Sequence, residues 1–243
     1  KQKHTHHKFM QGQEVRMIPL PAVYVMETTM PESMVDSVND YIDEYRKKED
    51  RKSLASTLVG QIHQGEQLLL DHTDERLTEY NQFICNLGAD YINYYGSAGN
   101  KVNGPKQVET DETWSVHSYD GDYNPIHDHG TKTVMGLSTT AWTKVPEQIG
   151  RTNATSPTYS LYNESGHSDG CIMFSYGQTS TLDSERLKPS QLITVTPEVG
   201  KLMVFPSWLQ HMVFPFKGEG ERRTIASNLN CWNAQQISPK EVQ

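Results

Sequence analysis

The second half of the chain alternates short β-prone runs with turn clusters, and this pattern constrains the fold more than any other feature. Eight such runs follow residue 112, at 113–119, 125–129, 133–145, 170–176, 191–196, 201–205, 211–216 and 222–232. Asp120-Gly121-Asp122 and the segment 217–220 carry the residue types that turns prefer. Many short strands separated by turns are typical of an antiparallel sandwich or barrel. The sequence therefore predicts a mainly β fold of the jelly-roll type.

Two amphipathic helices are predicted before this β region. In 31–50, Pro31 suits the first helical turn, and apolar residues then recur at helical spacing. In 73–95, the tyrosines lie on an apolar stripe, Thr73 is the expected N-terminal cap and Gly96 the expected stop. We expect these helices to support the β region.

Three further segments have a less regular pattern. Residues 15–28 resemble a strand pair, which Pro19 and Pro21 would restrict to a sheet edge. Residues 54–70 fit either a loop or a short helix. The stretch 146–168 is rich in Ser, Thr, Asn, Gly and Pro and predicts a long loop, of a length that is often functional.

The chain is expected to form one domain behind a short arm. Residues 1–13 are polar and hold a histidine cluster, which we interpret as a flexible arm rather than a metal site. No linker divides residues 14–243, so we predict a single domain. Its helical part spans 14–111 and its β core spans 112–232.

Composition limits the classes of function. The 22 Lys and Arg residues face 30 Asp and Glu residues, which gives a net charge of −8. This balance argues against a nucleic-acid partner, because such binding relies on clustered cations that replace counterions. No apolar run approaches the roughly 20 residues of a membrane span, and no secretory signal pattern is visible. The three widely separated cysteines suit free thiols, so we expect a cytoplasmic protein without a membrane partner.

One short motif carries candidate metal ligands. Residues 124–130 read Asn-Pro-Ile-His-Asp-His-Gly. If 126–129 is extended, His127 and His129 project to the same face because side chains alternate along a strand. Two imidazoles that project together can chelate a first-row metal ion. Asp128 lies between them and would point away on a regular strand.

A second motif lies about eighty residues later. An apolar strand leads through Phe205-Pro206 to His211, and Arg222 follows 11 residues beyond that histidine. An early His-x-His, a distant His and an Arg at this offset resemble the metal and cosubstrate residues of the iron(II)/2-oxoglutarate-dependent oxygenases.

Within that superfamily, the chain is similar to the 2OG-Fe(II) oxygenase family found in bacterial and phage genomes. The resemblance covers about residues 112–232 and rests on four matches: Trp114 and Gly121 before the His-x-His motif, Leu137 to Pro146, Phe205 to His211, and Arg222 to Asn228. It implies a double-stranded β-helix, a jelly-roll or cupin-like fold, buttressed by the N-terminal α-helices. The last match is the most specific of the four.

The resemblance also implies a site. Its cofactors would be Fe(II) and 2-oxoglutarate, with His127, His129 and His211 as metal ligands. A planar guanidinium binds a carboxylate through two hydrogen bonds, so an arginine would anchor the far carboxylate of 2-oxoglutarate. We assign this role to Arg222, because Thr224 stands two residues later where many relatives carry a second anchoring hydroxyl. Asn228 shares that face and would line the pocket floor.

Neighbouring residues leave alternatives open. Arg223 faces the other side of the strand and is interpreted as a solvent-facing charge. Its replacement should therefore have little effect on the binding of 2-oxoglutarate. His117 is expected to be packed or exposed rather than to line the pocket. Phe205 and Trp208 are expected in the core, and Trp142 could face either side.

The third ligand departs from the wider superfamily, which usually has a carboxylate where His129 stands. Three neutral imidazoles keep the +2 charge of the site, which favours dianionic 2-oxoglutarate but makes oxidation of the iron harder. Asp128 would restore a carboxylate ligand only if the strand bulged.

The resemblance implies an Fe(II)/2-oxoglutarate-dependent dioxygenase, an oxidoreductase that hydroxylates a small metabolite or a protein side chain. One rival is a three-His cupin-like dioxygenase without 2-oxoglutarate, against which Arg222 and Thr224 argue. The other is a non-catalytic jelly-roll module with a structural metal, which would need a fourth protein ligand. No motif in the sequence identifies the substrate or the oligomeric state, and the sequence is compatible with a homo-oligomer.

Overall fold

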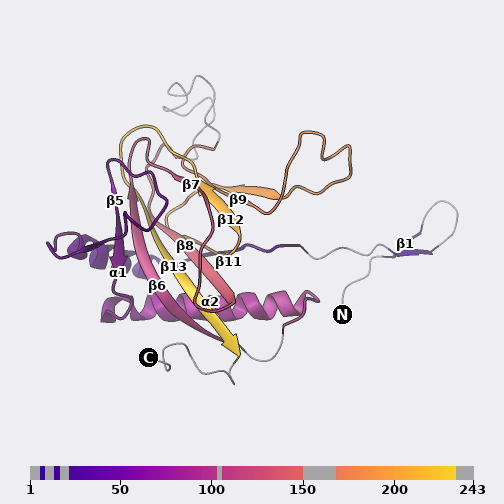
Figure 1. Ribbon diagram of the computed structural model, residues 1–243, viewed down its shortest axis with the longest axis horizontal. Helices are drawn as coiled ribbons and strands as arrows, with labels where there is room; N and C mark the ends of the chain where they lie inside the picture. The colour runs from indigo at the N-terminus through magenta and orange to yellow at the C-terminus, as the bar shows by residue number, and fades with distance from the viewer. Residues whose placement is uncertain (1–5, 9–13, 17–21, 103–105, 150–167, 234–243) are drawn as a thin grey trace.

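The computed structural model describes residues 6–8, 14–16, 22–102, 106–149 and 168–233. In this part of the chain, a seven-stranded sheet faces a four-stranded sheet, and two helices cover the other side of the larger sheet (Figure 1). The chain therefore has the jelly-roll architecture with supporting helices that the sequence predicted.

The larger sheet forms one wall of the barrel, in the order β3-β11-β8-β13-β6-β5-β4, and all its pairings are antiparallel. Its strands are β3 (Met26–Thr29), β4 (Lys52–Ser53), β5 (Glu66–Leu70), β6 (Lys106–Ser118), β8 (Met135–Lys144), β11 (Lys201–Pro206) and β13 (Arg222–Asn233). The central strands β6, β8 and β13 are the long ones, so they provide the frame on which the site is built.

The smaller sheet forms the opposite wall, in the order β10-β9-β12-β7. Its strands are β7 (Asn124–His127), β9 (Ile172–Ser175), β10 (Leu192–Val195) and β12 (Gln210–Val213). A cluster of buried apolar side chains from both sheets fills the space between them: Trp142, Ile172, Phe174, Met203, Phe205 and Leu209. This packing fixes the spacing of the two walls.

All eight predicted strands of the β region are present, with differences at their ends. The largest difference is β6, which begins at Lys106 rather than at residue 113. Its first half is rich in charged residues and lacks the β-prone pattern, but it pairs with β13 as far as Asn233. Tertiary pairing therefore extends a strand that local propensity does not predict.

The helices α1 (Glu32–Tyr45) and α2 (Thr78–Ser97) pack against the outer face of the larger sheet. A Cβ atom on Gly88 would lie 2.9 Å from Cγ1 of Val108 and 3.2 Å from Cδ1 of Leu229, so a glycine permits the close approach of α2 to the sheet. None of the helices in the described ranges is long and apolar enough to cross a membrane.

The predicted ends of the second helix are wrong by a few residues. A 3-10 turn, η1 (Glu75–Leu77), precedes α2, and Asp74 rather than Thr73 is its cap, accepting from the backbone N–H of Arg76 at 3.0 Å. Thr73 instead donates its hydroxyl to Asp71 at 2.6 Å. The helix passes through Gly96, and Gly99 has the left-handed φ of +93° just beyond its end.

The N-terminal strands also differ from expectation. β1 (His6–Lys8) pairs with β2 (Glu14–Arg16), whereas β3 pairs with β11 at the edge of the larger sheet. The edge position is confirmed for β3, but 15–28 does not fold as a strand pair. Most of the predicted arm 1–13 and most of the loop 146–168 lie outside the described residues.

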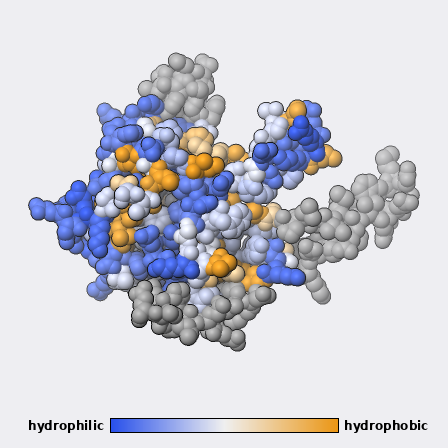
Figure 2. All heavy atoms as spheres, viewed as in Figure 1, coloured by the Kyte–Doolittle hydropathy of each residue, from blue (hydrophilic) through white to orange (hydrophobic). Residues whose placement is uncertain are grey.

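The surface is mostly hydrophilic in the view of Figure 2, with small and separate apolar areas. Trp208 is 57% exposed, so its predicted place in the core is wrong, whereas Phe205 is buried as expected. Trp208 belongs to the turn between β11 and β12, where its side chain reaches the surface rather than the space between the sheets.

Candidate metal centre

Three imidazoles converge at one end of the smaller sheet. His127 is the last residue of β7, His129 follows it, and His211 lies on β12. The pairing of β7 with β12 puts His211 directly opposite His127. One ring nitrogen of each histidine lies within 4.8 Å of those of the other two. The spacing allows all three side chains to bind one metal ion.

Backbone contacts orient these rings. Nδ1 of His127 lies 2.6 Å from the carbonyl oxygen of Pro125, and Nδ1 of His211 lies 2.9 Å from that of Leu209. When Nδ1–H donates to these carbonyls, Nε2 is left unprotonated, which is the form that binds a metal. The His129 and His211 Nε2 atoms are 3.1 Å apart.

His129 is held although it lies beyond the end of β7. Its backbone N–H donates to the carbonyl of Ser207 at 2.9 Å, which ties this segment to the turn before β12. Its ring stacks on that of Trp114 from β6, with centroids 5.4 Å apart. A residue of the larger sheet thus supports His129, which follows the last residue of a strand of the smaller sheet.

Burial keeps the three histidines neutral. Burial, with a smaller effect of the neighbouring histidines, lowers the pKa of His129 to about 3 and that of His211 to about 4. Burial also lowers the pKa of His127. The cluster therefore offers lone pairs rather than charges at neutral pH, as a cation site requires.

Asp128 points elsewhere. Its side chain is exposed and is not among the three residues that converge. The alternation expected from the sequence therefore holds through His129, and the arrangement does not favour the alternative in which Asp128 replaces that histidine.

A small cavity next to the histidines contains both predicted anchor residues. It is lined by His127, His129, His211, Arg222 and Thr224, together with Trp114, Val116, Ser118, Asn124, Thr139, Thr140, Trp142, Ile172, Phe205, Val213 and Ala226. Most of the remaining lining is apolar, so charged groups in this cavity are poorly hydrated. The cavity brings a metal-binding cluster and a guanidinium together.

Arg222 is buried without a carboxylate partner. Its Nη1 donates to the carbonyls of Phe214 at 2.8 Å and Gly170 at 3.1 Å, and its guanidinium lies 5.3 Å from the ring centroid of Phe216. Within the described ranges no carboxylate lies within ion-pair distance of Arg222, although Asp169 and Asp122 attract it electrostatically. Burial outweighs them and lowers the pKa of its guanidinium to about 10. A buried cation of this kind is suited to an anionic ligand.

Arg223 is not solvent-facing, which corrects the expectation from sequence. It is fully buried on the outer face of the sheet, beneath α1. Its guanidinium donates to Glu221 at 2.9 and 3.1 Å, to Asp43 at 2.5 Å and to Asn39 at 3.0 Å. The predicted parity of the two arginines is confirmed, but the partners on α1 were not foreseeable from the strand alone.

Asn228 shares the inner face of β13 but does not line this cavity. Its Oδ1 accepts from the hydroxyl of Ser138 at 2.9 Å, its Nδ2 donates to the carbonyl of Gly130 at 3.4 Å, and it lies against His129. Asn228 is therefore placed to hold the segment that carries His129. His117 is packed, as expected, with its Nδ1 2.5 Å from Oε1 of Glu221.

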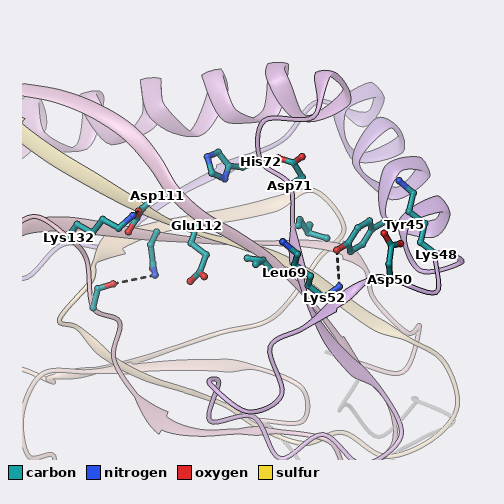
Figure 3. Close-up of a pocket in the computed structure, with 13 residues that line it drawn as sticks. Tyr45, Lys48, Asp50, Lys52, Leu69, Asp71, His72, Asp111, Glu112 and Lys132 are labelled. Atoms are coloured by element: carbon teal, nitrogen blue, oxygen red, sulfur yellow. Dashed lines mark hydrogen bonds and ion pairs between the residues drawn. The ribbon is translucent and has the colours of Figure 1, made fainter. Parts of the chain in front are cut away.

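A larger pocket is drawn in Figure 3, and Asn228 is part of its lining. It has a volume of about 700 Å³ and contains Gly130, the residue after His129. Its charged lining comes from the segment after α1, from β4, from the residue after β5, from β6 and from the segment between β7 and β8: Lys48, Asp50, Lys52, Asp71, Asp111, Glu112 and Lys132. Sequence reasoning missed this pocket, because its residues are far apart in the chain.

Comparisons with known proteins agree with this geometry. Residues 112–228 match the family described as Putative 2OG-Fe(II) oxygenase. No curated protein matches the chain in sequence.

Solved structures share the fold. A prolyl-4-hydroxylase of Pseudomonas putida is similar with a TM-score of 0.52 and 14% identity, over 86% of this chain and 92% of that one. AviO1 of Streptomyces viridochromogenes is similar with a TM-score of 0.53 and 11% identity, over 89% and 93%. SnoK, a carbocyclase dependent on α-ketoglutarate from nogalamycin biosynthesis, has a TM-score of 0.52 and 10% identity, over 90% and 85%.

The residues that match the 2OG-Fe(II) oxygenase family, 112–228, include every candidate metal and cosubstrate residue. The protein is thus an oxidoreductase whose cofactors are Fe(II) and 2-oxoglutarate. The residues of the cavity fit both: three neutral imidazoles suit the metal ion, and a buried guanidinium suits the dicarboxylate.

Proposed function

We propose that His127, His129 and His211 hold Fe(II), that Arg222 and Thr224 hold the far carboxylate of 2-oxoglutarate, and that the enzyme hydroxylates its substrate. One observation carries this proposal. A cluster of neutral imidazoles and a buried guanidinium without a carboxylate partner line the same small cavity. A buried guanidinium without a directly paired anion is costly, and the carboxylate of a bound ligand would offset that cost.

Iron(II) with 2-oxoglutarate supplies the oxidising chemistry, in which dioxygen is consumed and succinate and carbon dioxide are formed. The chain itself positions the participants. The carbonyls of Gly170 and Phe214 hold the guanidinium of Arg222 in one orientation, so little ordering is needed when a carboxylate arrives. Trp114 and the backbone contact to Ser207 hold the ring of His129. The apolar lining excludes water from the site.

The substrate is proposed to be a small metabolite or a protein side chain that approaches through the pocket of Figure 3. Gly130 and Asn228 line this pocket and lie next to His129, so a group bound there is close to the metal centre. Its volume of about 700 Å³ and its open, charged lining suit a polar substrate.

The rival functions have less support. A three-His dioxygenase that does not use 2-oxoglutarate would leave the guanidinium of Arg222 buried without a directly paired carboxylate. A structural metal site would be closed by a fourth protein ligand, and in the described part of the chain the group has three members.

The proposal can be tested by succinate formation from 2-oxoglutarate, together with the amount of iron bound per chain. We expect His211→Ala to lose both, because one of three ligands is removed from a buried site. The matched control is Asp128→Ala, which changes an exposed residue next to two of the ligands and should keep both. A His211→Ala protein that binds one iron per chain would contradict the proposed ligand set.

A further inference from the structure

The indole of Trp142 is a buried hydrogen-bond donor without a partner. The side chain is 1% exposed, and its Nε1–H donates to no protein atom in the described part of the chain. Trp232, by contrast, donates its Nε1–H to Oε1 of Gln107 at 2.9 Å. An unpaired buried donor costs free energy, so a group that accepts from it would stabilise the protein.

The position of Trp142 indicates which group that is. Trp142 lies on β8 directly opposite Thr224 on β13, and both residues line the cavity that contains Arg222. Directly paired residues have Cβ atoms about 5 Å apart, so the indole stands beside the proposed anchor for the far carboxylate. Trp142 also belongs to the apolar cluster between the sheets, so its ring is packed among buried side chains.

We propose that the Nε1–H of Trp142 is a third hydrogen-bond donor to the far carboxylate of 2-oxoglutarate, beside Arg222 and Thr224. This inference rests on the function proposed above. The indole nitrogen only donates, and an ionised carboxylate only accepts, with room for about four hydrogen bonds on its two oxygens. Arg222, Thr224 and Trp142 together supply donors to one carboxylate without any competing acceptor on the indole.

The direct test observes the indole itself. The chain has four tryptophans, so the nitrogen-15 spectrum should contain four indole signals, and Trp142→Phe identifies the one that belongs to Trp142. With zinc(II) in place of iron, which prevents turnover and is diamagnetic, 2-oxoglutarate should shift that signal strongly downfield. The signal of Trp232, which already has an acceptor, should stay in place.

A second ligand distinguishes the far carboxylate from other acceptors. 2-Oxobutyrate keeps the 2-oxo acid end that binds a metal but lacks the far carboxylate. It should leave the Trp142 signal unshifted. An equal shift with 2-oxobutyrate would overturn the assignment, because the acceptor would then be water or the metal-binding end of the ligand.

Affinity provides an independent readout. Trp142→Phe keeps an aromatic ring in the cluster and removes the N–H, so calorimetry on the nickel(II) protein should show about tenfold weaker binding of 2-oxoglutarate. Trp208→Phe, at an exposed site outside the cavity, is the control and should bind like the parent. If the parent protein does not bind 2-oxoglutarate, the proposed function fails. If the parent binds it while Trp142→Phe binds equally well and the indole signal does not move, the role of Trp142 alone fails.

Discussion

Replacing Arg223 with alanine should destabilise the fold while leaving the cavity residues in place. The guanidinium is fully buried and forms four hydrogen bonds, two of them to Glu221. Without it, the carboxylate of Glu221, whose side chain is 14% exposed, loses its closest cation. Removing one partner of a buried ion pair typically costs about 3–5 kcal/mol. His117 and Arg46 still contact Glu221, and Asp43 is 44% exposed, so we expect the lower end, about 3 kcal/mol.

Urea unfolding of the apoprotein measures this loss, with Lys217→Ala as the control. Lys217 pairs with Asp120 at the surface, so that change should cost well under about 1 kcal/mol. Arg222→Ala is the informative counterpart: it removes a buried cation without a carboxylate partner and should weaken 2-oxoglutarate binding far more than it affects unfolding. A loss below about 1 kcal/mol for Arg223→Ala would refute the reasoning about its ion pairs.

Three other outcomes are expected. Although burial raises the pKa of Glu221, hydrogen bonds from His117 and Arg223 lower it to about 2. The ionised carboxylate therefore adds about 3 kcal/mol to the free energy of unfolding. This contribution is complete above about pH 4.5 and is lost as the pH falls toward 2. Unfolding free energy measured across that interval for the parent and Glu221→Gln should converge at low pH, and parallel curves would contradict this. His129→Ala should lose iron in a metal assay while Asp128→Ala keeps it, and the reverse order would make Asp128 the ligand. His129→Asp should keep iron and form succinate at least as fast as the parent, because an anionic ligand lowers the charge of the site and eases oxidation of the iron; slower turnover with full iron would refute the charge argument.

The β region was predictable because its signals are local. Turn residues and β-prone runs mark all eight strands. Alternation also predicts that His127 and His129 project to the same side, although β7 ends at His127 and the contacts of His129 with Ser207 and Trp114 hold it there. The parity of Arg222 and Arg223 follows from the same period of two. These predictions depend on neighbours in sequence, so they need no knowledge of the packing.

The remaining errors concern contacts between distant segments. The acidic partners of Arg223 lie on α1 and just before β13, and the strand pattern gives no sign that α1 covers this position. The first half of β6 is polar and becomes a strand because β13 is long enough to pair with it. Asn228 keeps the predicted face but lies beside His129 and outside the cavity. The alternation of a strand predicts the face of a residue, but not which part of the opposite sheet the residue meets.

A crystal structure of the protein prepared without oxygen, with Fe(II) and 2-oxoglutarate bound, tests the central claim most directly. The account predicts one iron ion bound by Nε2 of His127, His129 and His211, with the far carboxylate of 2-oxoglutarate on Arg222 and Thr224. Iron bound by Asp128, or a 2-oxoglutarate whose far carboxylate lies away from Arg222, would contradict it.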